Sequence, residues 1–131
     1  MLQQRASGKY HCPGLWTNTC CSHPTPGEHT PDGATRRLRE EMGMDTPIQK
    51  LFNFTYKADF ENGLTEHEFD HVFVGLTNSF PQPNSEEVQD RKRVSWEDLD
   101  RDIQENSQRY TPWFLIMVRK YRTYFEKRQE L

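Results

Sequence analysis

Cysteine is scarce in this chain of 131 residues: only Cys12 and the adjacent pair Cys20 and Cys21 are present. Three thiols, two of them neighbours, make a poor disulfide framework, and no CxxC spacing indicates a structural zinc site. Long apolar runs are also missing, since none approaches the roughly 18 residues of a membrane-spanning helix, and the first residues do not resemble a signal peptide. The sequence therefore predicts a cytoplasmic protein with reduced thiols and no membrane partner.

An excess of one charge is missing too. The chain has 17 basic and 20 acidic residues, a formal net charge of -3, and no basic tail. This balance gives no indication of nucleic-acid binding, so we expect a small-molecule partner. With 33% hydrophobic residues the chain can build one modest core, which predicts a single domain over residues 1–131.

Apolar periodicity alternates between helix-like and strand-like, which is typical of an α/β or α+β domain. Residues 31–42 predict a helix with Thr30 as N-cap and Gly43 as its end. Two stretches rich in aromatic and β-branched residues, 50–60 and 65–76, predict paired strands, and the ENG tripeptide between them predicts the turn.

The C-terminal third predicts a polar, proline-broken loop, then a short strand at Arg93 and Val94, and a helix capped by Ser95 with Asp98 placed as in a capping box. A final helix begins after Thr111. Its apolar residues repeat at helical spacing and predict packing on the core: Phe114, Met117, Val118, Tyr121 and Phe125.

The EHE stretch inside the second strand could carry chemistry. Side chains alternate faces along a strand, so Glu66 and Glu68 point the same way about 7 Å apart, and Asp70 continues the row. Two carboxylates on one face can share a metal, but a solvated edge strand has the same pattern, and both interpretations stay open. His67 and His71 lie on the other face, where we expect packing or solvent contact.

His23 lies in a turn-rich segment with no apolar periodicity, two residues after a cysteine. Together with Glu66 and Glu68 it could form a mixed nitrogen and oxygen metal site. Each of these residues alone is weak support.

The helix at 31–42 carries two basic and two acidic side chains at helical spacing. Arg36 with Glu40, and Arg37 with Glu41, are i,i+4 pairs that stabilise any exposed helix by a few tenths of a kcal/mol. Their presence alone does not indicate a functional site.

A longer pattern includes these charges. Glu28, followed after seven residues by RRLREEMGM (36–44), resembles the Nudix box, G-x5-E-x7-R-E-U-x-E-E-x-G-U with U apolar. Ser22 stands in place of the first glycine, and Arg37 in place of a glutamate that belongs to the metal-binding cluster of Nudix hydrolases. Arginine cannot bind a metal but can hold a phosphate through two hydrogen bonds. The altered box implies a site that binds a diphosphate without cleaving it.

Four motifs in this order and spacing closely resemble the type I isopentenyl-diphosphate isomerases: WTNTCCSHP (16–24), the altered box, EHE (66–68) and TPW (111–113). The resemblance extends from Gln4 to the final helix. It implies a Nudix-like α/β/α sandwich around a mixed sheet, and the interconversion of isopentenyl and dimethylallyl diphosphate.

The resemblance implies four catalytic residues. Cys21 takes the place of the catalytic thiol, and Glu68 that of the catalytic carboxylate on the opposite face of the substrate. Tyr56 matches the tyrosine beside that carboxylate, and Trp113 the indole that faces the reacting carbons. Cys20 is expected to face the core.

The resemblance also implies binding sites for two metals and for the diphosphate. His23, Glu66 and Glu68 match ligands of a divalent metal, Mn²⁺, Zn²⁺ or Mg²⁺, and Glu41 matches the ligand of a Mg²⁺ that also holds the diphosphate. The basic contacts of the diphosphate are matched by Arg5, Lys9 and Arg37.

The implied chemistry explains these residue types. Moving the double bond adds a proton at one end of the alkene and removes another, through a tertiary carbocation that water would trap. Two proton-transfer groups must therefore face each other across a dry pocket. The π-face of Trp113 can stabilise the cation by about 2 kcal/mol when desolvated.

One departure from the family concerns its further metal ligands. The family uses two more histidines and one more lysine from a segment before the strand that carries Arg5. Of the five histidines here, only His23 stands at a matching position. His11 and His29 lie in the wrong motifs to replace the two missing ligands, unless the site is rearranged. We therefore expect that this chain, a fragment or a shortened homologue, binds its metal weakly and has low or no isomerase activity. We expect a monomer, with a sheet edge open to self-association. A Nudix hydrolase and a non-catalytic protein that binds a diphosphate or a metal stay open as alternatives.

Overall fold

The computed structural model describes residues 1–60 and 63–129. Its strands are β1 (Leu2–Arg5), β2 (Trp16–Thr17), β3 (Gln49–Asp59), β4 (Thr65–Val74) and β5 (Val88–Lys92). Its helices are α1 (Thr30–Met42), α2 (Trp96–Asn106), the 3-10 turn η1 (Ser107–Arg109), α3 (Pro112–Lys120) and α4 (Arg122–Gln129). Strands and helices are combined in one fold, which confirms the predicted α+β class.

The strands form two antiparallel sheets, one in the order β2-β1-β5 and one of β3 with β4. The single mixed sheet that we expected is not seen in the described residues, where parallel pairing is limited to an isolated bridge between Trp16 and Tyr110. The short connection between β3 and β4 is the physical reason for one of these pairings, because a parallel pair needs a long crossover.

The β3–β4 hairpin is close to prediction. Its strands begin and end within two residues of the expected bounds, and Phe52, Phe54 and Tyr56 face the core at a period of two. Of the predicted ENG turn, Glu61 and Asn62 lie outside the described residues. Gly63 has a φ of 82°, a conformation that glycine adopts without strain.

Helix α1 ends as predicted and begins one residue earlier than predicted. Gly43 adopts the left-handed conformation (φ 61°), and its N–H bonds to the carbonyls of the last turn. The N-cap is His29 rather than Thr30, and its side chain makes no capping hydrogen bond. Pro31, which needs no partner for its nitrogen in the first turn, explains why the helix starts here.

The predicted strand at Arg93 and Val94 is wrong: β5 covers Val88–Lys92 instead. Val88 is almost fully buried and anchors β5, while most of the other side chains in the strand are exposed. Polar side chains are typical of edge strands. This segment, which resembled a loop in sequence, therefore forms an edge strand.

The C-terminal helices follow the prediction in part. Ser95 caps α2 by accepting a hydrogen bond from Asp98 N over 3.1 Å, as expected. The single final helix is divided at Tyr121, which has a φ of -116°. Its ring stacks on Phe52 with 4.8 Å between centroids, so tertiary packing favours the break.

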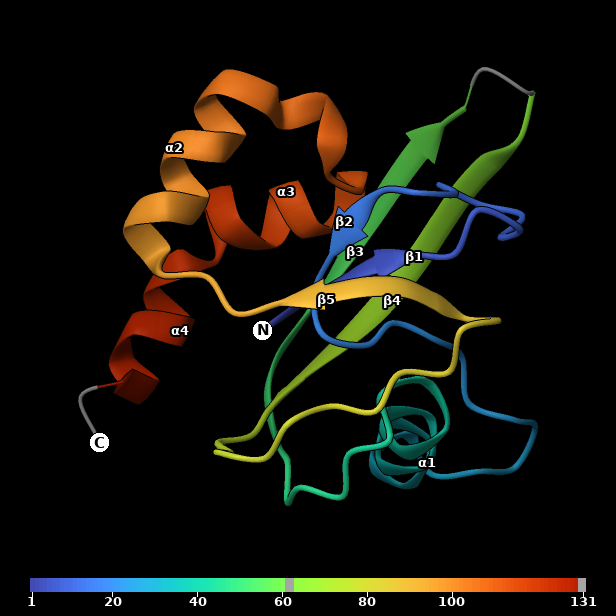
Figure 1. Ribbon diagram of the computed structural model, residues 1–131. Helices are drawn as coiled ribbons and strands as arrows, with labels where there is room; N and C mark the ends of the chain where they lie inside the picture. Colours follow the sequence, from blue (N-terminus) through green and yellow to red (C-terminus); the bar gives the residue numbers. More distant parts are fainter. Residues whose placement is uncertain (61–62, 130–131) are drawn as a thin grey trace.

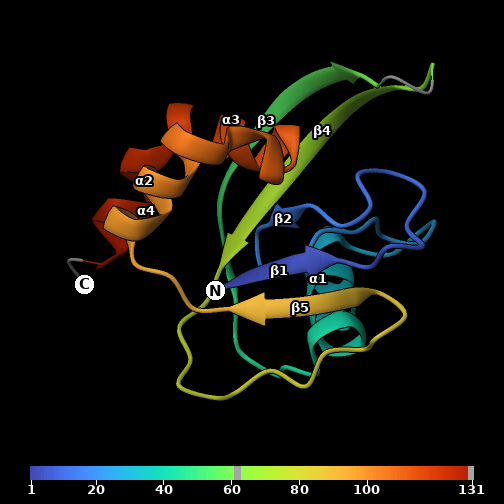
Figure 2. The same cartoon turned by 45° about the horizontal axis from the view of Figure 1, so that its top comes forward.

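Two clusters of buried side chains hold the layers together. The larger joins β3, β4, α2 and α3, and the smaller joins α1 to Val88 and Met44. Helix α1 accordingly lies apart from the group of α2, α3 and α4, with the strands between them (Figures 1 and 2). This arrangement agrees with helices on both sides of the strands.

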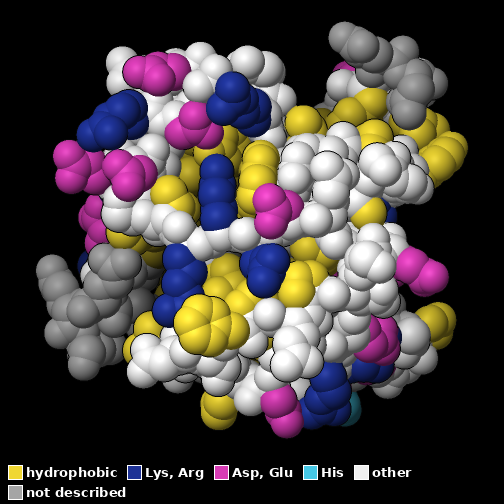
Figure 3. Space-filling view, viewed as in Figure 1, with side chains coloured by type: hydrophobic (Ala, Val, Ile, Leu, Met, Phe, Trp, Pro, Cys, Tyr) yellow, Lys and Arg dark blue, Asp and Glu magenta, His cyan; other side chains and the backbone are white. Residues whose placement is uncertain are grey.

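On the face shown in Figure 3, side chains of both charges are interspersed with exposed apolar ones. A shallow groove lies among Met1, Phe80 and the basic residues Arg91, Lys92 and Arg93. None of the described helices has the length and apolar character needed to cross a membrane.

Candidate active site

The carboxylate row of β4 faces inward. Glu66, Glu68 and Asp70 are partly buried, whereas the alternate residues His67, Phe69 and His71 are exposed. A solvated edge strand would show the acidic side chains to water, so this burial favours a functional row. Its members pair across the hairpin with Ala58, Tyr56 and Phe54.

Negative charge accumulates along this row. Burial, together with the neighbouring carboxylates of Glu68 and Glu66, raises the pKa of Asp70 to about 7. The row therefore carries more negative charge than its surroundings compensate, which is an environment that attracts a cation.

Glu66 is held from two sides. The Tyr56 hydroxyl donates a hydrogen bond to Glu66 Oε2, although Tyr56 pairs in register with Glu68. Burial and this bond raise the pKa of Tyr56. The family resemblance led us to expect that Tyr56 supports Glu68. Its long side chain instead reaches Glu66, the diagonal neighbour across the hairpin.

On its other side Glu66 meets an unexpected residue. His11 Nδ1 lies 3.4 Å from Glu66 Oε1. This nitrogen is buried and has no hydrogen-bond partner among the described residues. His11, which matches none of the family's metal ligands in the sequence, therefore lies beside the carboxylate row.

His23 reaches the same row from the loop before α1. Its Nε2 lies 3.6 Å from Glu68 Oε1. Two ligands bound to one tetrahedral metal are roughly 3.4 Å apart, so this pair fits a divalent cation in donor type and spacing. Among the described residues, no three His, Cys, Asp or Glu side chains surround a common metal position, so the expected set of His23, Glu66 and Glu68 is not brought together. Glu66 instead accepts the hydrogen bond from Tyr56.

The adjacent thiols face different parts of the molecule. Cys21 packs against the larger core cluster, and burial raises its pKa to about 12, with the Asp70 carboxylate adding to the effect. Cys20 packs against the smaller cluster, as expected for a core thiol, and its Sγ lies 3.6 Å from Glu41 Oε2. Both thiols are free and protonated at neutral pH.

Trp113 lies at the base of this region. It is 4% exposed, and its indole N–H donates to Asn18 Oδ1 over 3.2 Å. Its ring centroid is 6.1 Å from that of Tyr56. The Arg5 guanidinium lies 5.4 Å from the Trp113 ring centroid and donates to the carbonyl of His11. The π-face that we expected to meet a carbocation thus already attracts a positive charge.

Arg37 is the centre of a second cluster. Its guanidinium contacts Glu40 at 2.6 Å, Glu41 at 3.5 Å and Glu87 at 3.4 Å. Its Nε donates to Ser22 Oγ over 2.7 Å. The i,i+4 pair predicted for this residue is confirmed.

Lys9 joins the same cluster through Glu87. The Lys9 ammonium bonds to Glu87 Oε2, and this bond holds the pKa of Glu87 below its usual range. Glu41 is 1% exposed, and burial raises its pKa against the opposing effects of Arg37 and Lys9. Lys9, Arg37 and Glu41 are therefore together as expected, whereas the contacts of Arg5 are with Trp113 and His11.

The remaining box residues serve the fold. Arg36 pairs with Glu28 at 2.9 Å and with Glu40 at 2.9 Å. A Cβ at Gly33 would lie 2.9 Å from Glu28 Oε1 and 3.1 Å from Pro24 Cβ, so a side chain there would require these neighbours to shift. This glycine passed unnoticed in the sequence, where it resembles any glycine near a helix start.

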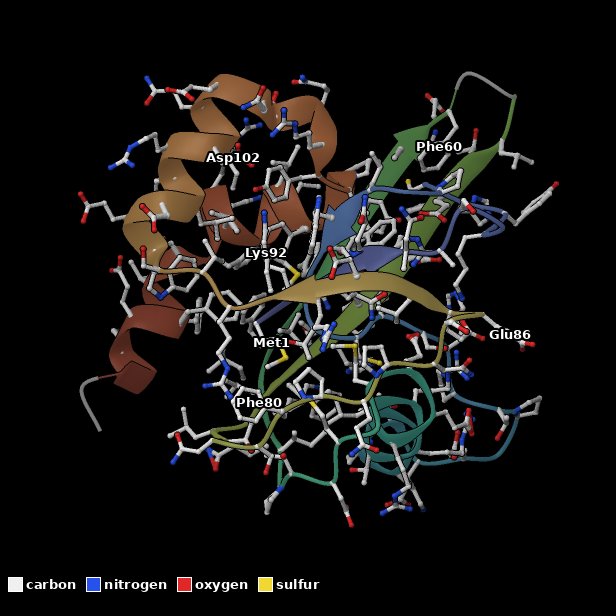
Figure 4. The ribbon with its side chains drawn as sticks, in the orientation of Figure 1. Met1, Phe60, Phe80, Glu86, Lys92 and Asp102 are labelled. Carbon is white, nitrogen blue, oxygen red and sulfur yellow. The ribbon has the colours of Figure 1, made fainter. Side chains whose placement is uncertain are left out.

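An open groove adjoins the carboxylate row. It encloses about 410 Å³ and is lined by His11, Cys12, Tyr110 and Phe60, among others. Figure 4 shows Phe60 just beyond the end of β3. The groove therefore opens on the His11 side of the site.

Comparison with known proteins gives consistent matches. The family model described as the NUDIX domain matches residues 1–114. The "Isopentenyl-diphosphate Delta-isomerase 2" of Aromatoleum aromaticum is 51% identical over 113 residues, covering 86% of this chain and 60% of that protein. An "Isopentenyl-diphosphate Delta-isomerase" of Pectobacterium atrosepticum is 42% identical over 126 residues, covering 96% of this chain and 70% of that protein.

A third relative is similar to the same extent. The "Isopentenyl-diphosphate Delta-isomerase" of Cereibacter sphaeroides is 46% identical over 125 residues, covering 92% of this chain and 70% of that protein. The chain thus spans between 60% and 70% of the length of these three curated relatives.

Proposed function

Because the chain belongs to the Nudix family and, within it, to the isopentenyl-diphosphate Delta-isomerases, we propose that it interconverts isopentenyl and dimethylallyl diphosphate. The observation that carries this proposal is the position of Arg37. A Nudix hydrolase would have a metal-binding glutamate there, and here a guanidinium lies beside Glu41 and shares Glu87 with Lys9. Such a cluster suits holding a diphosphate rather than cleaving it.

The proton transfers are proposed to use Cys21 and Glu68. One group gives a proton to the terminal methylene carbon of the substrate, which leaves a tertiary carbocation. The other removes a proton from the carbon on the far side of the cation, and the remaining electron pair forms the new double bond. Since the reaction is reversible, each group acts as acid in one direction and as base in the other.

Support for this assignment comes from the electrostatics around the thiol. Asp70, Glu41 and Glu68 all raise the pKa of Cys21, so the carboxylates lie near enough to interact with it. The protonated thiol can donate its proton to the substrate, and because it is neutral it does not attract water into the pocket. Trp113, Tyr56 and the core cluster exclude solvent from this side.

Trp113 is proposed to stabilise the cation. Arg5 already lies over its ring, which agrees with the attraction of a π-face for positive charge. Tyr56 is proposed to fix the carboxylate row through its bond to Glu66.

We also propose two metal positions. His23 and Glu68, with Glu66, would hold one divalent metal, and Glu41 would hold Mg²⁺, an ion that proteins commonly bind through one or two carboxylates and the substrate's phosphate oxygens. When bound, these ions neutralise the diphosphate and the carboxylate row. Lys9, Arg37 and Arg5 would complete the neutralisation of the diphosphate.

The setting is proposed to be the cytoplasm, where the three free thiols stay reduced, and the chain is proposed to act as a monomer. The hydrolase alternative is disfavoured by Arg37. A purely binding role would assign no function to the Cys21 thiol.

A product assay tests the proposal. The chain is incubated with isopentenyl diphosphate and Mg²⁺, and the products are separated and identified. Dimethylallyl diphosphate supports the isomerase, released phosphate supports a hydrolase, and absence of any product contradicts both enzymatic functions.

A further inference from the structure

Glu87 lies where the loop enters β5, and its backbone is fixed on both sides. Its carbonyl accepts a hydrogen bond from Ala6 N over 3.1 Å, and its own N–H donates to Asn84 O over 3.0 Å. The side chain is partly buried, with 25% of its surface exposed. The position of the carboxylate is therefore set by the backbone as well as by its partners.

A single oxygen of Glu87 serves two cations. Oε2 bonds to the Lys9 ammonium and lies 3.4 Å from Arg37 Nη2. Lys9 and Arg37 are the two basic residues that the structure brings together at the proposed diphosphate site. The carboxylate thus lies where a phosphate oxygen would bind both of them.

The charges of the cluster do not favour an additional anion. Lys9 and Arg37 contribute two positive charges, and Arg36 adds a third through its pair with Glu40. The carboxylates paired with these three cations contribute four negative charges: Glu28, Glu40, Glu41 and Glu87. A diphosphate must therefore replace a carboxylate or bring its own cation.

We propose that Glu87 is an internal competitor for the diphosphate, which binds Lys9 and Arg37 by displacing the Glu87 carboxylate. This inference rests on the proposed function, because it assumes that the two cations hold the substrate. In this proposal, Glu87 sets the affinity of the site for diphosphates and the extent to which this affinity depends on Mg²⁺. When the carboxylate is displaced, Glu41 and Glu87 both lose part of their cationic partners, and a divalent ion that arrives with the diphosphate restores the balance.

The test is calorimetric titration with inorganic pyrophosphate, with and without Mg²⁺, of the unchanged chain, Glu87→Gln and the control Glu86→Gln. Both variants lose the same charge at adjacent positions, but Glu86 is exposed and points away from the fold at the start of β5 (Figure 4). We expect Glu87→Gln to bind pyrophosphate about two- to fivefold more tightly without Mg²⁺, the upper part of the range that such ion pairs contribute. Glu86→Gln should match the unchanged chain.

Mg²⁺ should increase the affinity of the unchanged chain more than that of Glu87→Gln. If the unchanged chain binds pyrophosphate and Glu87→Gln binds it equally or less tightly, the competition is contradicted while the diphosphate site stands. If neither binds pyrophosphate, the diphosphate site itself is contradicted. Binding with the expected pattern but without isomerisation would leave the competition in place and overturn the isomerase function.

A second measurement needs no substitution. The side-chain carboxyl resonance of Glu87 in the ¹³C spectrum of the unchanged chain should shift on saturation with pyrophosphate, because the carboxylate loses its two cations. The resonance of Glu86 should stay in place. A stationary Glu87 resonance under saturation would contradict the displacement.

Discussion

Arg37 donates a hydrogen bond from Nε to Ser22 Oγ over 2.7 Å. These are the two positions at which the chain differs from the Nudix box, and they lie 15 residues apart in the sequence. A glycine at position 22 could not offer a side-chain acceptor, and a glutamate at position 37 could not donate. The two departures are therefore a matched pair, and Ser22 orients the guanidinium that the proposed diphosphate site requires.

Removal of the serine hydroxyl should weaken that site. Ser22→Ala loses a hydrogen bond to a charged group, worth about 1.5 kcal/mol at the lower end of its usual range and less here because the pair is exposed. We expect the affinity for pyrophosphate to fall about threefold in a calorimetric titration. Ser85→Ala, at an exposed position, provides the control and should leave the affinity unchanged. An equal effect of both substitutions would contradict a role of Ser22 in orienting Arg37.

Substituting each cysteine in turn should distinguish the role of Cys21 from that of Cys20. Cys21→Ala removes a proposed proton-transfer group and should lower the rate of isomerisation at least about 100-fold, the lower range for general acid–base catalysis. Cys20→Ala and Cys12→Ala should keep most of the rate. Equal losses in the three variants, measured as dimethylallyl diphosphate formed per minute, would contradict the assignment of Cys21.

The Tyr110 hydroxyl should stabilise the fold in a pH-dependent way. It bonds to Asp102, and this bond lowers the pKa of Asp102 below its ordinary value of 3.8. Stability from a lowered carboxyl pKa is present above the unfolded value and is lost as the pH falls through the folded value. Tyr110→Phe should therefore cost about 1 kcal/mol at pH 7 in urea unfolding, and the difference should narrow below pH ~4.

The exposed ring of Tyr124 offers the control for this experiment. Tyr124→Phe removes a hydroxyl without a hydrogen bond to Asp102 and should show no pH-dependent difference. If the cost of Tyr110→Phe is the same at pH 7 and pH 3, its bond to the ionised carboxylate is not the cause.

Gly43 should tolerate no side chain. Its φ is 61°, and a Cβ would lie 2.5 Å from the carbonyl oxygen of Gln82. Gly43→Ala should lower the free energy of unfolding by at least about 1–2 kcal/mol, the cost of the left-handed conformation alone. Gly8→Ala is the matched control, because no atom lies within 4 Å of its added Cβ. Equal unfolding midpoints of the two variants in urea would contradict this prediction.

The parts of the fold that local patterns determine could be predicted from the sequence. The alternation in 65–76 placed Glu66, Glu68 and Asp70 on one face, and their burial bears this out. The end of α1 at Gly43 was predicted for the same reason, because a left-handed glycine terminates a helix locally.

Features that depend on distant contacts could not be predicted. β5 is a strand because it pairs with β1, more than 80 residues away in the chain, and its own sequence is polar. The division between α3 and α4 at Tyr121 accompanies stacking on Phe52. Neither contact leaves a periodic signal in the segment concerned.

The candidate site likewise contains residues that the sequence indicated and residues that it did not. Lys9, Arg37 and Glu41 were found through the resemblance, but Glu87 stands in a loop with no motif, and its role becomes visible only when Lys9 and Arg37 are brought to it. His11 was set aside because of its place in the sequence, yet it lies 3.4 Å from Glu66. Its buried ring nitrogen, which has no hydrogen-bond partner in the described part of the chain, is a structural signal that sequence reasoning lacks.

The isomerase function is tested most directly by following solvent deuterium into the product. The chain is incubated with isopentenyl diphosphate and Mg²⁺ in D₂O, and the products are analysed by mass and NMR spectrometry. Protonation by an exchangeable group of the protein predicts dimethylallyl diphosphate that early in the reaction carries one deuterium in a methyl group, with no released phosphate. Release of phosphate, or recovery of unlabelled isopentenyl diphosphate alone, would contradict the proposed function.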